Sequence, residues 1–273
     1  MKKKKETIHY APTYFIEPVH PITVALIGCG GTGSLVAPRL ARLDYVLKEL
    51  GLPGLYMTVY DGDIVEKNNV GRQNFNKNDI GDYKAANIVE KINLSYGLDW
   101  DCRNEYVQDI PQANIIISCV DNVKFRNIVH KKFRTKHSGG RSDYNTNYYW
   151  LDCGNGKDFG QVVLGTFADI KQPQKSIYDC QGSLPTVIDI YGKLSQYDTK
   201  EAQGIDGCSM AESLAKQDVF INDEIAIQAV KIVQQLVRNY RISYHGAVVN
   251  QATNKVIGIP VPQNKTKCQK KNH

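Results

Sequence analysis

Short apolar runs alternate with helical periodicity over the first half of the chain. Residues 22–27 are apolar and rich in β-branched side chains, and the run ends at Gly28, as a buried parallel strand does. The same pattern recurs, with strands expected at 55–60 and 114–120 and helices at 34–50, 79–96 and 122–136. We expect Pro38 in the first turn of its helix and Asp79 as an N-cap. The alternation predicts an α/β fold: a Rossmann-like, doubly wound, mostly parallel sheet with helices on both faces.

The second half adds strands and one strong helix. Residues 148–152 and 161–167 read as strands, and 168–209 is irregular. Residues 222–241 carry a clear apolar stripe, with Asn222 placed to cap that helix. Strand-like pieces follow at 246–249 and 255–259. We therefore expect C-terminal strands and a helix to complete one domain.

Composition places the chain among globular proteins. It has 273 residues and a net charge of +6. The basic excess lies at the two ends, in residues 2–5 and in 265–271, and the segment between them is close to neutral. Such ends are either solvated tails or weak attractors of an acidic partner, and nucleic acid is not expected as the main partner. The seven cysteines include no Cys-x-x-Cys pair, and no leader or long apolar run is present. These features favour reduced thiols, a cytoplasmic location and no membrane span.

A glycine-rich run follows the first strand. Gly28, Gly30, Gly31 and Gly33 stand between that strand and the next helix. There, backbone N–H groups can approach an anion, and Asp61, at the end of the second strand, can bind ribose hydroxyls. Alone, these residues fit a NAD-dependent oxidoreductase, or a tight turn without a ligand.

Further polar residues change that interpretation. Downstream of the turn stand Asp63, Asn69, Arg72, Gln73 and Lys84. A carboxylate can hold a divalent cation, Arg72 and Lys84 can neutralise phosphate charge, and the two amides can donate hydrogen bonds. Asp121 and Asn122 end the third strand, and ligands bind at such ends. The set suits a nucleotide whose phosphates are attacked.

These motifs carry a family resemblance. The runs are Gly28 to Ser34, Asp61-x-Asp63, Asn69-Val70-Gly71-Arg72-Gln73-Asn74-Phe75, Asp79-Ile80-Gly81, Lys84-Ala85 and Asp121-Asn122-x-x-x-Arg126. Together they closely resemble the ThiF/MoeB/E1 family, which adenylates the C-terminal glycine of ubiquitin-like proteins with ATP and magnesium. Parts of residues 152–165 and 209–222 look like the ThiF-like protein of bacterial PRTRC cassettes, whose neighbours are a small ubiquitin-like protein and a JAB-type peptidase.

The resemblance implies a role for each residue. Asp61 holds the ribose, Asn69, Arg72 and Lys84 contact phosphates, and Gln73 supports the loop. Asp121 binds Mg²⁺ with help from Asp63, and Asn122 lies beside the nucleotide. It also implies a homodimer and an E1-type adenylation domain over 21–262, with a nucleotide-binding half at about 21–135 and a modifier-binding, cysteine-containing half at about 145–262. Residues 1–20 form a basic arm and 263–273 a basic, disordered tail.

Relatives often transfer the activated glycine to sulfur. Cys208 is the first candidate nucleophile and Cys180 the second; the alternative for both is an inert thiol, and for Cys180 it is the favoured interpretation. Cys29 and Cys119 are expected in the core. The two zinc-binding Cys-x-x-Cys pairs of many relatives are missing, as is any arginine in residues 1–20, so no zinc is expected. A non-catalytic nucleotide-binding scaffold subunit stays open as an alternative, as does the identity of the product: a thioester, a thiocarboxylate or a free adenylate.

Overall fold

An eight-stranded sheet organises the part of the chain that the computed structural model describes, which is residues 5–120, 123–133, 146–192 and 219–263. Its strands are β2 (Ile22–Ile27), β3 (Leu55–Tyr60), β4 (Asp101–Arg103), β5 (Ile115–Ser118), β6 (Tyr149–Asn155), β7 (Phe159–Thr166), β10 (Tyr244–Asn250) and β11 (Lys255–Pro260). The spatial order is β11-β10-β7-β6-β5-β2-β3-β4. The strands from β4 to β6 run parallel, and β7, β10 and β11 continue the sheet in antiparallel fashion. The expected doubly wound, mostly parallel sheet is therefore confirmed.

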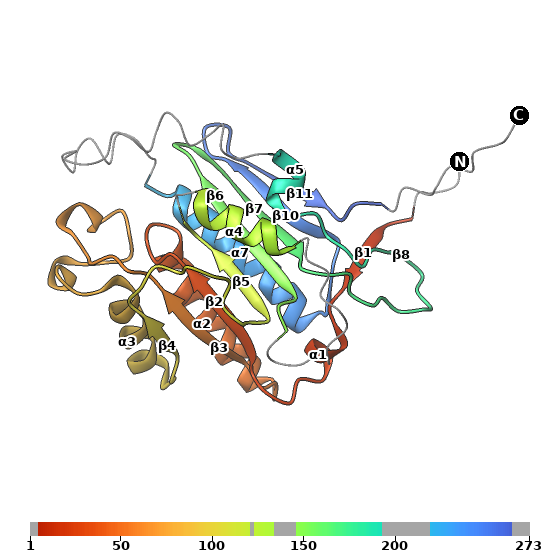
Figure 1. Ribbon diagram of the computed structural model, residues 1–273, viewed down its shortest axis with the longest axis horizontal. Coiled ribbons are helices and arrows are strands. Elements are labelled where there is room, and N and C mark those ends of the chain that lie inside the picture. The colour runs from red at the N-terminus through yellow and green to blue at the C-terminus, as the bar shows by residue number, and fades with distance from the viewer. Residues whose placement is uncertain (1–4, 121–122, 134–145, 193–218, 264–273) are drawn as a thin grey trace, which may run out of the picture.

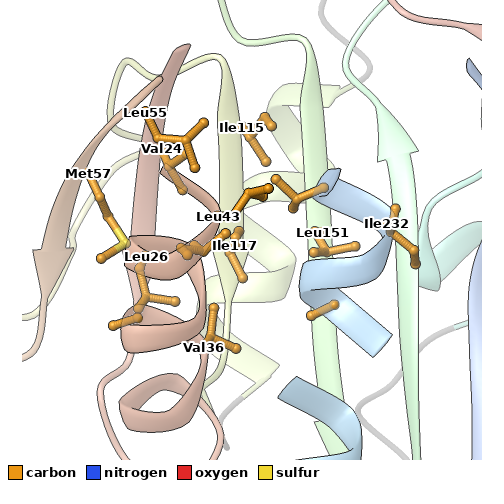
Figure 2. Close-up of a cluster of buried hydrophobic side chains, with 14 of the residues drawn as sticks. Val24, Leu26, Val36, Leu43, Leu55, Met57, Ile115, Ile117, Leu151 and Ile232 are labelled. Atoms are coloured by element: carbon orange, nitrogen blue, oxygen red, sulfur yellow. The ribbon is translucent and has the colours of Figure 1, made fainter. Parts of the chain in front are cut away.

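Helices cover both faces of the sheet (Figure 1). One face carries α2 (Gly33–Glu49), α3 (Lys84–Tyr96) and α7 (Ile221–Arg238), and the other carries α4 (Val123–Phe133) and α5 (Val187–Tyr191). Strand β2 shows how alternation divides the core: Val24 and Leu26 pack under α2, whereas Ala25 and Ile27 face α4. Figure 2 shows the first cluster, in which side chains from β2, β3, β5 and β6 meet α2 and α7. No helix in the described ranges is long and apolar enough to cross a bilayer.

A second, three-stranded sheet holds the N-terminal segment. Strand β1 (Thr7–Tyr10) pairs in parallel with β8 (Asp179–Cys180) and antiparallel with β9 (Arg241–Ile242). The short helix α1 (Thr13–Ile16) follows, and its Phe15 is buried against Tyr148 and Tyr149. Part of the segment expected as a basic arm therefore packs on the body of the protein.

Several expected boundaries need correction. Helix α3 begins at Lys84 instead of Asp79, because Gly81 (φ +100°) turns the chain, and Asp79 closes a separate 3₁₀ turn, η2 (Lys77–Asp79). Pro38 lies inside α2 beyond its first turn. Asn222 lies within α7 and does not cap it, since the N-cap is Phe220. The short strands β1 and β4 had no apolar run to reveal them.

Candidate active site

The glycine turn closes tightly between β2 and α2. Gly28 has φ +87°, and a Cβ at this position would lie 2.7 Å from the Cys119 carbonyl oxygen. A Cβ on Gly33 would lie only 1.9 Å from the carbonyl oxygen of Gly28. Both positions therefore require glycine, and the first N–H groups of α2 are presented at the carboxyl edge of the sheet. This is the strand–turn–helix geometry that the motif predicts.

Asp61 braces that turn from the neighbouring strand. It follows β3 directly, and its carboxylate accepts the backbone N–H of Cys29 (N···O 2.5 Å) and that of Asp63 (2.9 Å). Burial raises the pKa of Asp61, and these two N–H groups partly oppose the shift. A carboxylate has about four acceptor positions, so capacity remains for hydroxyl donors.

Asp63 links a buried lysine to an exposed tyrosine. Lys84 Nζ donates to Asp63 Oδ2 at 3.0 Å, and the Tyr106 hydroxyl donates to Asp63 Oδ1. Burial of Asp63 works against its ionisation, but the hydrogen bonds from Tyr106 and Lys84 prevail and lower its pKa. The bond to Asp63 in turn raises the pKa of Tyr106 to about 12. Tyr106 was missed in the sequence, because it follows the short strand β4 and belongs to no motif.

The loop between Asp63 and α3 contains the amides and the arginine of the motif. It begins with η1 (Lys67–Asn69), where Asn69 Oδ1 accepts the backbone N–H of Glu66 at 2.9 Å. The carbonyl of Asn69 accepts the N–H of Arg72 (3.3 Å) and that of Gln73 (2.9 Å). A Cβ on Gly30 would lie 3.9 Å from Gln73 Nε2, so the Gln73 amide lies beside the glycine turn. Asn69 thus shapes the loop that presents Arg72 and Gln73.

A tether holds this loop on the start of α2. The backbone N–H of Asn74 donates to Ser34 Oγ (3.1 Å), and Asn74 Nδ2 donates to the Ser34 carbonyl (3.2 Å). That carbonyl would ordinarily accept the N–H four residues later, but residue 38 is proline and has none. Pro38 therefore leaves an acceptor that Asn74 uses, a role that its place in the sequence did not indicate.

Asn222 joins the turn to the C-terminal half. Its Oδ1 accepts Thr32 Oγ1 (2.9 Å) and Asn155 Nδ2 (2.7 Å). A Cβ on Gly31 would lie 2.8 Å from the same oxygen. The side chain is buried, and its Nδ2 has no hydrogen-bond partner among the described residues. The glycine turn thus rests on residues from β6 and α7.

Comparison with known proteins settles the family. The family model described as "ThiF family" matches residues 16–268. The chain belongs to the ThiF family. None of the curated proteins compared with it matches. Among solved structures, Escherichia coli MccB with ATP superposes with a TM-score of 0.56 at 15% identity, over 93% of this chain and 68% of that one.

Two further structures share the fold. E. coli MccB with MccA-N7isoASN gives a TM-score of 0.56 at 18% identity, covering 90% of this chain and 66% of that chain. PaaA gives a TM-score of 0.55 at 14% identity, covering 91% of this chain and 67% of that chain. This ThiF-family chain therefore spans about two thirds of the length of these neighbours. At such identities the likeness establishes the common fold.

Three site residues predicted for this ThiF-family protein fall outside the described ranges: Asp121, Asn122 and Cys208. Arg126, from the same motif as Asp121, is described and buried. Its Nε pairs with Asp152 Oδ1 at 2.8 Å, and Ser118 Oγ donates to the same oxygen at 2.7 Å. Arg126 thereby fastens α4 to β5 and β6.

The described cysteines differ in setting. Cys180 lies in β8, beside β1 and away from β2 and β3 in Figure 1, and it lines a cavity of about 470 Å³ with Tyr178 and Ser176. The structure therefore does not bring Cys180 to the glycine turn. Cys29 is fully buried, as expected of a core residue, and burial raises the pKa of its thiol. Cys119 is half-buried, and a hydrogen bond with the free thiol of Cys153, together with burial, raises the pKa of its own thiol.

A magnesium ion fits the described residues only in part. Asp63 is the acid expected to assist, and both of its oxygens already accept hydrogen bonds, from Tyr106 and Lys84. The carboxylate of Asp61 already accepts two backbone N–H groups, and its remaining acceptor positions are those expected to serve the ribose hydroxyls. Asp121, which lies outside the described residues, therefore remains the predicted ligand of the ion.

Proposed function

We propose that this protein is an ATP-dependent adenylyltransferase that activates the C-terminal carboxylate of a peptide or protein. More narrowly, we propose a small ubiquitin-like protein ending in glycine as the substrate. Membership of the ThiF family supports adenylation, and MccB, a neighbour in fold, has been solved with ATP and with MccA. The observation that carries the proposal is the convergence of the glycine turn, Asp61 and the buried Lys84 at one edge of the sheet.

The chemistry balances with ATP as co-substrate. A carboxylate oxygen attacks the α-phosphorus, a bond forms between them, and the α–β bridging P–O bond breaks. Pyrophosphate leaves with that electron pair, and the product is an acyl adenylate. The carboxylate oxygen thus becomes part of a good leaving group, which a later nucleophile can displace. Magnesium, when bound, would neutralise charge on the phosphates.

The described residues supply positioning and positive charge. We assign the α2 N-terminus and its turn to the phosphates and Asp61 to the ribose hydroxyls. Lys84, now paired with Asp63, and Arg72 on its loop carry the charge that stabilises the departing pyrophosphate. Gln73 lines the turn beside Gly30.

Pyrophosphate exchange tests the adenylation step. Purified protein, supplied with a small ubiquitin-like protein that ends in glycine, should incorporate labelled pyrophosphate into ATP only when magnesium is present. Arg72→Ala should abolish exchange without changing the unfolding transition, and Lys77→Ala, an exposed lysine of η2, serves as the matched control. Absence of exchange in the wild type with several C-terminal glycine substrates would refute adenylation.

Transfer to sulfur is a separate part of the proposal. Cys208 is the first candidate, with Cys180 second, and a homodimer and a JAB-type peptidase partner are proposed with it. Cys208→Ala should retain exchange and lose any thiol-labile adduct, whereas Cys180→Ala should retain both. An adduct that survives in the Cys208 variant would refute that assignment.

The NAD-dependent oxidoreductase remains the second candidate, because the glycine turn and Asp61 would suit it equally. Calorimetry with MgATP and, separately, with NAD distinguishes the two, using the wild type and Asp121→Ala. Binding of MgATP that weakens in the variant, without NAD binding, favours adenylation. Binding of NAD alone favours the oxidoreductase. MgATP binding without any exchange would favour the scaffold subunit.

A further inference from the structure

An exposed aromatic ring lies against the Asp61-Gly62-Asp63 turn. Tyr106 is 65% exposed, although its ring contacts the backbone of Gly62. A Cβ on Gly62 would come within 2.9 Å of ring carbons Cδ2 and Cε2 of Tyr106. The absence of a side chain at residue 62 is therefore what allows the ring to lie flush on this turn.

The ring is held in place through its hydroxyl, which donates to Asp63, itself paired with Lys84. The backbone carbonyl of Tyr106 accepts Gln108 Nε2 at 3.2 Å, a bond that helps to fix the main chain carrying the ring. An exposed aromatic side chain that is already fixed loses little rotamer entropy when a flat ligand covers it.

The order of the strands places the Tyr106 ring next to Asp61, the proposed ribose-binding residue, on the side away from the glycine turn. In the order β4-β3-β2, the glycine turn follows β2, Asp61 follows β3, and Tyr106 follows β4. The Asp61 N–H donates to the carbonyl of Arg103, the last residue of β4, so these segments are neighbours. A nucleotide with phosphates at the turn and ribose at Asp61 points its base towards the β4 side.

We propose that Tyr106 is a specificity-determining residue that stacks on the purine base of the nucleotide. The assignment rests on the proposed function, since it requires a nucleotide with its ribose at Asp61. Stacking of a base on an aromatic ring contributes about 1–3 kcal/mol, which corresponds to about 5- to 150-fold in affinity. A purine has the larger face and should gain more than a pyrimidine.

Calorimetry with three probes tests the assignment. Wild type and Tyr106→Leu are titrated with ATP, UTP and inorganic tripolyphosphate at one magnesium concentration. We expect the ATP Kd of the Leu variant to rise about 5- to 150-fold and the preference for ATP over UTP to narrow, with tripolyphosphate unchanged within about twofold. Tyr106→Phe keeps the ring and should lose less than the Leu variant. Tyr45→Leu, an exposed tyrosine of α2, is the matched control and should change nothing.

Gly62→Ala provides an independent variant. The new Cβ must displace the Tyr106 ring, so Gly62→Ala alone should weaken ATP binding. Added to Tyr106→Leu, the same substitution should have little further effect. Equal weakening of all three probes in Tyr106→Leu, or unchanged ATP binding, overturns the assignment alone. A wild-type protein that binds no MgATP overturns the proposed function together with it.

Discussion

Thr32 and Asn222 are 190 residues apart in sequence and are joined by a hydrogen bond of 2.9 Å from the Thr32 hydroxyl to the Asn222 amide oxygen. Asn155 donates to the same oxygen at 2.7 Å. The bond couples the glycine turn to α7, and therefore the proposed nucleotide-binding half to the half that follows it. The conformation of the turn thus depends on the packing of α7.

Asn222→Ala should destabilise the protein by about 1–3 kcal/mol, because the buried Thr32 hydroxyl and the Asn155 amide lose their acceptor. Urea unfolding measures the change. Asn78→Ala, at an exposed position of η2, is the control and should shift stability by less than about 0.5 kcal/mol. Equal stabilities of the two variants would show that the cluster contributes nothing.

Asp152→Ala should lower the free energy of unfolding by about 3–5 kcal/mol, more than Asn222→Ala does. The reason is that it leaves the buried guanidinium of Arg126 without its carboxylate. Replacing Arg126 by Met in the same chain should restore at least half of the loss. The comparison is the exposed pair Arg103–Asp101, for which Asp101→Ala should cost no more than about 1 kcal/mol. Chemical denaturation of these three variants and of Arg126→Met alone decides the matter, and additive effects of Asp152→Ala and Arg126→Met would contradict it.

Stability should fall as the pH drops below neutrality because of His9. Its Nδ1–H donates to the Gln181 carbonyl, and its Nε2 lies 2.8 Å from the Tyr149 hydroxyl, from which a neutral ring accepts. Burial lowers the pKa of His9 to about 4, outweighing the opposing bond to Gln181, and nearby His245 lowers it further. A lowered folded-state pKa means that this contribution is fully present above about pH 6.5, the unfolded value, and is lost as the pH falls through about 4.

The expected loss from His9 is about 2 kcal/mol between pH 7.5 and pH 5. Urea unfolding at both pH values measures it. His9→Gln should flatten this dependence by about that amount, whereas the remaining slope includes His245, whose pKa burial also lowers. An unchanged slope in the variant would show that His9 is not responsible.

Asn74→Ala should release the loop that carries Arg72 and Gln73. The Ser34 carbonyl then loses its donor, since Pro38 has no N–H to replace it. We expect about 0.5–1.5 kcal/mol of lost stability, together with weaker MgATP binding. In a Pro38→Ala background residue 38 can donate to Ser34, so the stability cost of Asn74→Ala should shrink. A double-mutant cycle by urea unfolding measures this coupling, and strict additivity would argue against the tether.

The local pattern of apolar residues predicted much of the central sheet. The runs at 22–27 and 55–60 match β2 and β3 residue for residue, because a buried parallel strand is a continuous apolar run and Gly28 and Asp61 end these two sharply. The glycine turn followed from the same reasoning, since glycine is required wherever a Cβ would strike the backbone. The spacing of the motifs likewise predicted that Asp61, Asp63 and Lys84 lie at the carboxyl edge of the sheet.

Tertiary structure decided what local pattern left open. Asn222 can cap a helix or accept from Thr32, and the choice depends on the packing of α7 against α2. Tyr106 and Asn74 acquired their partners only because β4 and the loop lie beside Asp63 and Ser34. Cys180 resembled a nucleophile in sequence, yet pairing of β8 with β1 placed it in another sheet. Sequence alone thus determined strands β2 and β3 and the glycine turn, because their causes are local. The partners of each polar side chain depend on contacts between distant segments.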